Sequence, residues 1–391
     1  MEVKQIYTLI NSVSSEVLGK TDLVQENLTG IIDLGNEVFN QNAVDNYVKS
    51  LVNHIGKVVF VNRPYSGKVP SVLMDVWEFG SVLEKISADV PQAEENDTWN
   101  LQDSKEYKQD TFHKPTVTAK FFNSKVTFEV PVSITERQVK ESFSSAEQLN
   151  GFLSMIYSAV EKSMTIKADA LIMRTINNMV AETLKADKTA FGGSSVDYSS
   201  ASTVRCVNLL KLYNEKTGAV TPLTAAKSIT DPEFIRFAAY IMGLYSDRMQ
   251  TVSTLFNVGE KERFTPVDIL HTVLLSDFAK AAQAYLYSDT YNKDQVLLPN
   301  AETVPSWQAS GKNYDFTSVS TINVNSASGE AVNVSGVLGV MFDRDALGVC
   351  NLDKRVTTTY NAKAEFFNNY FKFDAGYFND TNENFVVFFV A

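Results

Sequence analysis

The chain has 391 residues, 44% of them hydrophobic, which is enough to bury a substantial core and suggests two or three lobes. Its formal net charge of -11, from 46 acidic and 35 basic residues, argues against a surface that grips phosphates. The two cysteines follow no CxxC pattern, so we expect neither a disulfide framework nor a zinc site, and a reducing compartment fits best. No secretory signal and no run of ~18 apolar residues is visible, which predicts a soluble protein without membrane contact.

The first 45 residues carry seven acidic side chains against two lysines. Apolar residues recur in this segment at loosely helical spacing, first at 6, 9, 10 and 13 and again at 28, 31, 32 and 34. The pattern predicts an acidic arm with one or two short helices rather than an independent domain. An ordinary helical lead-in is the alternative.

Strand patterns begin after residue 57. Short extended runs are predicted at 58–61 and 69–77. Two further strand-like segments, 81–90 and 116–132, lie on either side of a polar, acidic stretch with little periodicity. Because a loop of that length is uncommon inside a compact domain, we expect a projecting hairpin with a charged tip over about 80–132.

A very long helix is predicted next. Ser144 and Glu147 have the spacing of a capping box, and apolar residues then recur at helical spacing to about Ala186 without a proline. A helix over 144–187 would be about 60 Å long, whereas helices average ~11–12 residues. Lys167 interrupts a strict coiled-coil seam, so we expect the helix to lie along a sheet. The inward-facing residues at its start would be Leu149, Phe152, Ile156 and Val160.

Helices and short strands alternate in the second half of the chain. The glycines after Phe191 are predicted to stop the long helix, since a phosphate loop would need Lys and Ser/Thr at fixed offsets. Asp231 and Pro232 mark a helix start. The helical patterns are at 203–214, 231–245 and 267–286, and the extended runs at 252–256, 295–298, 318–324 and 334–341. A long aromatic strand within 355–378 and a doubly buried strand at 385–390 complete an α+β pattern.

No residue pattern points to catalysis, a cofactor or a metal. The histidines His54, His113 and His271 have no partner at metal-ligand spacing, and His271 lies on a predicted helix. Cys206 is interpreted as a small buried thiol in a helical stretch. Fingerprints of nucleotide-binding proteins, zinc proteases and hydrolases are missing from the sequence. These observations favour a structural role over an enzymatic one.

The order of arm, hairpin, very long helix, mixed lobe and late strand resembles that of tailed-bacteriophage major capsid proteins with the Hong Kong 97-type fold. Local sequence is similar to the phi-29-type podophage branch of these proteins. The segments that carry the resemblance are LVNHIGKVV at 51–59, FEVPVSI at 128–134, FLSMIYSAV at 152–160 and MFDRDA at 341–346. We expect no additional immunoglobulin-like domain of the kind that some relatives carry at the C-terminus.

The resemblance implies five parts. These are an N-terminal arm (1–56), a P-domain strand with the E-loop hairpin (57–143), the spine helix of the P-domain (144–195), an A-domain (196–353), and a long P-domain strand with a final core strand (354–391). It also implies that the tip of the E-loop contacts a neighbouring subunit. The contacting residues would be Glu94, Glu95, Asp97, Trp99, Lys105, Tyr107 and Lys108.

The resemblance further implies that hexamers and pentamers of the chain form an icosahedral or prolate head shell. Portal and scaffolding proteins would take part, and the shell would enclose double-stranded DNA without binding it specifically. Assembly would take place in the host bacterial cytoplasm, and the protein would reside in the virion. The alternatives are an encapsulin-type nanocompartment shell of the same fold, another virion component, and an enzyme whose site carries no recognisable motif.

Overall fold

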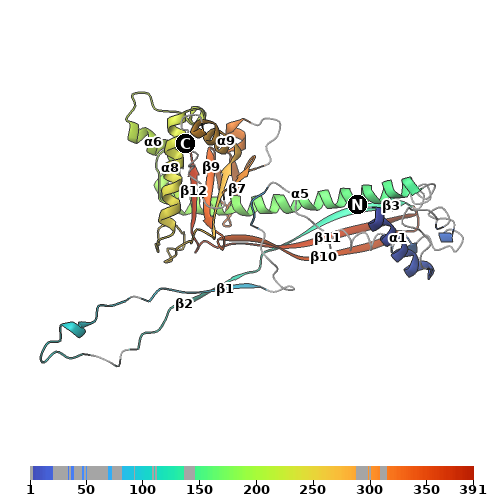
Figure 1. The fold of residues 1–391 in the computed structure, drawn as a ribbon, viewed down its shortest axis with the longest axis horizontal. Coiled ribbons are helices and arrows are strands. Elements are labelled where there is room, and N and C mark those ends of the chain that lie inside the picture. The colour runs from blue at the N-terminus through green and yellow to red at the C-terminus, as the bar shows by residue number, and fades with distance from the viewer. Residues whose placement is uncertain are drawn as a thin grey trace.

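The fold consists of one very long helix, two main sheets and a projecting hairpin (Figure 1). Helix α1 (Val3–Leu18) lies where the acidic arm is predicted to be helical, and its residues Ile10 and Val13 are buried. The expected strand at 58–61 lies outside the described part of the chain, as do residues 73–77 of the strand expected at 69–77, whose residues 69–72 are described and form no strand. The computed structural model describes residues 3–20, 34, 37–38, 46–47, 50, 69–72, 82–91, 93–107, 110, 112–135, 146–287, 298, 301–308 and 315–391.

Helix α5 (Ala146–Ala186) is continuous over 41 residues, which is about 60 Å at 1.5 Å per residue. The prediction of one helix over 144–187 is therefore confirmed. From Val160 onward the apolar positions that the spacing places on the inward face are buried: Val160, Met164, Leu171, Ile176, Met179, Val180 and Leu184. Gly192 ends this part of the chain in a left-handed conformation with φ of 91°, directly after the short helix η2 (Lys188–Phe191). The capping residue Ser144 and the side chains of Leu149, Phe152 and Ile156 lie outside the described residues.

One side of α5 packs on a three-stranded antiparallel sheet (Figure 1). The strands lie in the order β10 (Leu347–Asn361), β11 (Phe366–Asn379) and β3 (Lys125–Thr135). Alternate residues of β11, such as Phe371 and Phe373, are buried, while their neighbours are partly exposed. This is the period of two that a sheet covered on one face requires.

The single late strand predicted within 355–378 is wrong, because β10 and β11 form a hairpin with a turn at 362–365. The turn contains neither Gly nor Pro, and Glu365 takes a positive φ of 54°. The signal for the turn is the single Asn361, whose side-chain oxygen accepts hydrogen bonds from the backbone N–H groups of Lys363 and Ala364 at 3.1 and 3.2 Å. Strand β10 also begins at Leu347, so the expected boundary at 354 falls within a strand.

A mixed five-stranded sheet forms the centre of the other lobe. Every residue of β9 and β12 is buried. Along β12, Phe385 and Val387 face one apolar cluster, whereas Val386 and Phe388 face another. This confirms the prediction of a last strand that is buried on both faces. The strand order is β4 (Cys206–Asn208), β12 (Phe385–Phe389), β9 (Val337–Asp343), β5 (Leu270–Leu275) and β6 (Ala301–Val304).

Helices cover one face of the five-stranded sheet (Figure 1). The predicted cap of the longest of them is confirmed, because the side chain of Asp231 accepts a hydrogen bond from the backbone N–H of Phe234 at 2.8 Å. The helices of this lobe are α6 (Leu209–Thr217), α7 (Ala225–Ser228), α8 (Pro232–Met249), α9 (Ser276–Tyr287) and α10 (Phe316–Val319). A small hairpin of β7 (Ile322–Asn325) and β8 (Ala331–Val334) packs on α5.

Two segments that we expected to be helical begin as strands. Cys206 lies in β4, which pairs in parallel with β12, and His271 lies in β5, which pairs with β9 and β6. Helices α6 and α9 begin only after these strands, at Leu209 and Ser276. A short apolar run fits a strand or a buried helix equally well. Pairing with distant segments decides between them.

Among the predicted extended runs, 334–341 largely matches β9, whereas 318–324 begins with the single turn of α10 before β7. The run at 252–256 contributes only an isolated bridge between Ser253 and Arg263. Residues 295–297 lie outside the described part.

The hairpin projects away from the body of the molecule (Figure 1). Strands β1 (Leu83–Ala88) and β2 (Val117–Phe122) pair in antiparallel fashion, and the one-turn helix η1 (Asp97–Trp99) lies near the tip. The predicted hairpin is therefore confirmed. The predicted strand at 116–132 is two strands, since β2 pairs with β1 in the hairpin whereas β3 pairs with β11 in the three-stranded sheet.

Replacing Ile166 with proline should break α5 in its middle. The side chain of Ile166 is 56% exposed, so the change removes a backbone hydrogen bond and adds a clash without emptying the core. We expect the free energy of unfolding, measured by urea titration, to fall by about 3 kcal/mol or more. The matched control Ile166→Ala should change it by only about 0.5 kcal/mol. Equal stability of the two variants would contradict the prediction.

Candidate functional site

The described residues include no group of three or more His, Cys, Asp or Glu side chains that could hold a metal ion. His113 is exposed in the hairpin tip, and His271 stacks on Phe342 with ring centroids 5.8 Å apart. Burial lowers the pKa of His271 although Glu302 opposes the shift, so this imidazole is neutral near pH 7. His54 lies outside the described residues.

Both cysteines are buried free thiols. Burial raises the pKa of the Cys206 thiol well above its ordinary value, which makes it a poor nucleophile. The interpretation of Cys206 as a small buried thiol is thus confirmed, although it lies on a strand. Within the described ranges, no helix is both long enough and apolar enough to cross a membrane.

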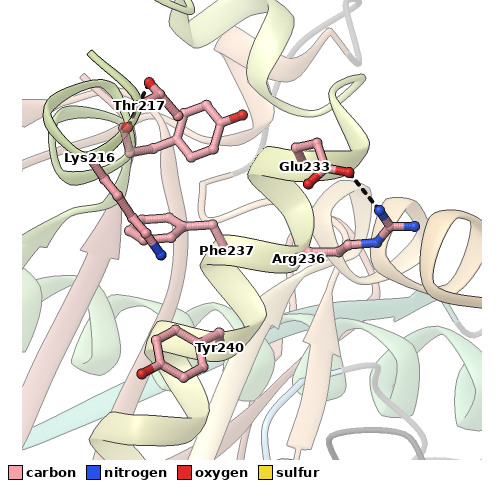
Figure 2. A pocket seen from close by; sticks show the side chains of 7 residues that line it. Lys216, Thr217, Glu233, Arg236, Phe237 and Tyr240 are labelled. Atoms are coloured by element: carbon pink, nitrogen blue, oxygen red, sulfur yellow. Dashed lines mark hydrogen bonds and ion pairs between the residues drawn. The ribbon is translucent and has the colours of Figure 1, made fainter. Parts of the chain in front are cut away.

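A surface pocket of about 530 Å³ lies between α6 and α8 (Figure 2). The ammonium group of Lys216 lies 5.1 Å from the ring centroid of Phe237 and 5.9 Å from that of Tyr240, and Glu233 binds Arg236 at 2.6 Å. These charged groups are therefore already engaged by neighbours within the pocket. Its lining contains no histidine or cysteine.

The tip of the hairpin contains the predicted contact residues. Asp97 forms an ion pair with Lys105, whose ammonium lies 5.2 Å from the ring centroid of Tyr107. The Tyr107 hydroxyl accepts a hydrogen bond from the backbone N–H of Gln102 at 2.9 Å, so this ring supports the tip itself. Trp99 is 94% exposed. Glu94 and Glu95 are exposed outside this cluster, and Lys108 lies outside the described residues.

The stem of the hairpin has one polar and one apolar face, in an unusual orientation. Along β1 and β2 the partly buried positions include Lys85 and Lys120, which point toward the body. The opposite face is apolar and exposed: Ile86 is 66%, Val117 58% and Phe121 62% exposed. An isolated chain would normally turn its apolar face inward. Beyond the Leu83–Phe122 pair at its base the stem does the reverse, although Glu84 also lies on its outer face.

Asp380 attaches the stem to the body. Its two carboxylate oxygens bind the ammonium groups of Lys85 and Lys120, each at 2.9 Å, and its side chain is 3% exposed. Lys85 also binds Glu383 at 3.3 Å, and Arg263 binds the same carboxylate at 3.3 Å. Asp380 and Glu383 lie in the turn between β11 and β12.

The pKa values of this cluster favour the charged forms. Burial by itself would raise the pKa of Asp380, but the hydrogen bonds from Lys120 and Lys85 outweigh it and lower the pKa. Burial would likewise lower the pKa of Lys85, but Glu383 and Asp380 outweigh it and raise the pKa. Both groups are therefore ionised at neutral pH.

Sequence reasoning missed this attachment. The alternation of Lys85 with its neighbours in β1 places it on one face, and Asp380 stands in a recognisable Asn-Asp-Thr-Asn turn. Neither signal joins the two positions, since Lys120 and Asp380 are 260 residues apart. Their meeting depends on the tertiary fold.

The geometry defines a class of protein: an α+β chain whose hairpin stands clear of its own core and has exposed apolar side chains. The family model for Phi29-like phage major capsid protein matches residues 10–389. The chain belongs to this family, and it is a structural protein of the phage capsid shell and hence of the virion.

Several solved capsid structures are similar to this chain. The capsid structure of Staphylococcus phage Andhra matches with 8% identity and a TM-score of 0.47, over 85% of this chain and 87% of that chain. The capsid structure of the Cyanophage P-SCSP1u matches with 11% identity and a TM-score of 0.45, over 85% of this chain and 92% of that chain. The asymmetric unit of the mature capsid of bacteriophage PhiM1 matches with 8% identity and a TM-score of 0.41, over 85% of this chain and 88% of that chain. No curated protein matches the sequence.

The difference in stability between the protein and its Asp380→Asn variant should change only at acid pH. A carboxylate with a depressed folded pKa contributes stability that is present above its unfolded pKa of about 3.9 and is lost as pH falls through its folded pKa. Urea unfolding should therefore give a constant difference from about pH 8 to 5, and a shrinking one below about pH 4. A difference that remains unchanged at the acid end would contradict the assignment. Asp97→Asn, at the exposed tip, is the control and should differ little from the parent protein at any pH.

Proposed function

We propose that this chain is the head-shell subunit of a tailed phage, with the Hong Kong 97-type fold, and that its copies form hexamers and pentamers. The family match over residues 10–389 carries the proposal. The element order supports the fold, since an arm helix, a hairpin, a 41-residue helix, a lobe and two long closing strands follow one another. The family match also favours a phage head over a nanocompartment shell.

In this scheme the elements take the roles of the fold family's parts. Helix α1 belongs to the N-terminal arm, the β1–β2 hairpin is the E-loop, and α5 is the spine helix. The P-domain consists of α5 with the sheet of β3, β10 and β11. The A-domain is the lobe around the five-stranded sheet, and we assign β12 to it because β12 pairs with β4 and β9.

The hairpin is the proposed contact with a second copy of the chain. Its tip offers exposed charges and Trp99, which suit an adjustable contact around an aromatic anchor. Its stem offers Ile86, Val117 and Phe121 on one face. A shell contains many copies of its subunit, so weak contacts of this kind add up over the assembly. A neighbouring copy that covers this face would remove its apolar side chains from water, which accounts for their exposure in the single subunit.

Deleting residues 94–110 should leave a folded subunit that does not form shells. The described residues of this segment are exposed, so its loss removes little core. Negative-stain microscopy of the expressed chain should show shells, sheets or capsomers for the parent protein and none for the deletion. Circular dichroism should report the same helix content for both. Loss of helix content would show that the tip is part of the subunit's own structure.

A second variant separates the stem from the tip. The double substitution Ile86→Ser and Phe121→Ser removes apolar surface from the stem's outer face and leaves the tip intact. We expect normal helix content and impaired assembly. The control is Thr357→Ser, an exposed position on β10 in the body, which should assemble as the parent does. Normal shells from the stem variant would restrict the contact to the tip.

We further propose that the shell encloses double-stranded DNA without binding it specifically, after assembly in the bacterial cytoplasm with portal and scaffolding proteins. The net charge of -11 supports this, since a wall that held its cargo tightly would need clustered cations. The exposed face of α5 carries Lys162, Lys167 and Arg174, but the guanidinium of Arg174 lies 5.5 Å from the ring centroid of Tyr377. These cations are also spread along the helix rather than clustered.

Titration of the unassembled subunit with duplex DNA at ~0.15 M salt should give a dissociation constant weaker than ~10⁻⁶ M, the tight end of ordinary non-specific binding. The result should not depend on DNA sequence. A variant with Lys162, Lys167 and Arg174 changed to Gln serves as the control and should bind equally weakly. Tighter binding that this variant abolishes would mean that α5 forms a real DNA-binding surface.

A further inference from the structure

The base of the hairpin contains a pair of like charges that is unfavourable by itself. Lys85 and Lys120 are directly opposite each other in the register of β1 and β2. Like charges at such positions destabilise an antiparallel pair. Here both ammonium groups bind the same buried carboxylate, Asp380, one on each oxygen at 2.9 Å. Asp380 therefore offsets the repulsion between the two lysines, and Glu383 adds a second carboxylate partner for Lys85 at 3.3 Å.

Asp380 stands at a structural joint. The chain crosses between the five-stranded and the three-stranded sheet twice, from β9 to β10 through 344–346 and from β11 to β12 through 380–384. The backbone N–H of Asp380 donates to the carbonyl of Ala346 at 2.6 Å, which joins the two crossings. Lys85 donates to the carbonyl of Asp345 at 2.9 Å, so this lysine touches both of them.

Apolar packing holds only the near end of the stem. Leu83 and Phe122 contact a small cluster with Cys350 and Phe378, and the rings of Phe122 and Phe378 are 5.2 Å apart. The next inward-facing pair along the stem is the two lysines. Beyond them, Asp89 binds Lys261 of the lobe at 3.2 Å.

The described contacts that hold the stem to the body from the lysine pair outward are thus polar: ion pairs, a hydrogen bond from Lys85 to a backbone carbonyl, and one from Lys120 to the hydroxyl of Thr381 at 3.2 Å. The side chains of Lys85 and Lys120 are 22% and 33% exposed, so their ammonium groups can move into water without opening a cavity, whereas an interdigitated apolar contact cannot move without doing so. The cost of opening falls on Asp380, which is buried and keeps only neutral donors such as the backbone N–H of Asn382. A stem held in this way can be released as a unit while the body stays folded.

We propose that Lys85, Lys120 and Asp380 form a clamp that fixes the angle of the hairpin relative to the joint between the two sheets. When the clamp is closed, the hairpin is attached to the two chain crossings at 344–346 and 380–384. A shift of these crossings therefore moves the hairpin with them. When the clamp is open, the lysines repel each other and the hairpin pivots on its Leu83–Phe122 end. This inference does not depend on shell assembly, because it concerns a single subunit.

The test uses Asp380→Asn in the full chain, measured as the unassembled subunit isolated by size exclusion. Asparagine removes the charge and keeps an oxygen for the backbone N–H of Asn382, which Asp380 now binds at 3.1 Å. Spin labels on introduced cysteines at Ala119 in β2 and Ala170 in α5, both exposed, report the angle of the hairpin. The native cysteines are buried and do not compete for the label.

The parent protein should give one narrow distribution of label distances. Asp380→Asn should lose that single maximum, while its helix content stays unchanged. The matched control Asp97→Asn breaks the Asp97–Lys105 ion pair at the tip and should keep the narrow distribution. A distribution for Asp380→Asn that superimposes on the parent's would overturn the proposal.

A second variant keeps the test decisive if Asp380→Asn fails to fold. The double substitution Lys85→Gln and Lys120→Gln opens the clamp from the hairpin side and leaves the turn at 380–384 intact. It should broaden the Ala119–Ala170 distances, while a label pair at Ala170 and Val220, within the body, stays unchanged. Loss of helix content in the double variant would mean that the lysines stabilise the body, and the clamp would be rejected. Assembly is not a readout here, so failure of the clamp leaves the proposed shell function untouched.

Discussion

Two lysines face each other across the base of the hairpin, and the buried carboxylate of Asp380 makes that arrangement possible. A buried carboxylate is costly unless it is paired, and a cross-strand pair of lysines is costly unless it is neutralised. Each cost is offset by the same contact. Because Asp380 lies where the chain passes from the three-stranded to the five-stranded sheet, this contact relates three parts of the molecule: the hairpin, the long sheet under α5, and the lobe.

The rest of the structure separates folding from assembly. The two large apolar clusters lie along α5 and within the lobe, and the stem contributes only Leu83 and Phe122 to a small third one. The hairpin thus contributes little to the described core. Its lysines face its own body through ion pairs, which leaves Ile86, Val117 and Phe121 exposed on the other face.

Some elements could be predicted because their signal is local. Helix α5 follows from apolar spacing without a proline, and β12 follows from an uninterrupted apolar run after a turn. The hairpin follows from two strand patterns around a polar stretch. The β10–β11 hairpin was missed because its turn carries no Gly or Pro, and Cys206 and His271 were assigned to helices because short apolar runs do not distinguish strand from helix.

The sequence by itself determined the class of the protein: an acidic α+β chain with a long helix, a projecting hairpin and no catalytic pattern, in an order that resembles phage capsid proteins. It also identified the charged tip, because composition and exposure are correlated along a polar segment. Only the tertiary structure decided how the hairpin is held and which of its faces is free. That choice depends on Asp380 meeting lysines 260 or more residues away, and no local pattern encodes a contact of that range.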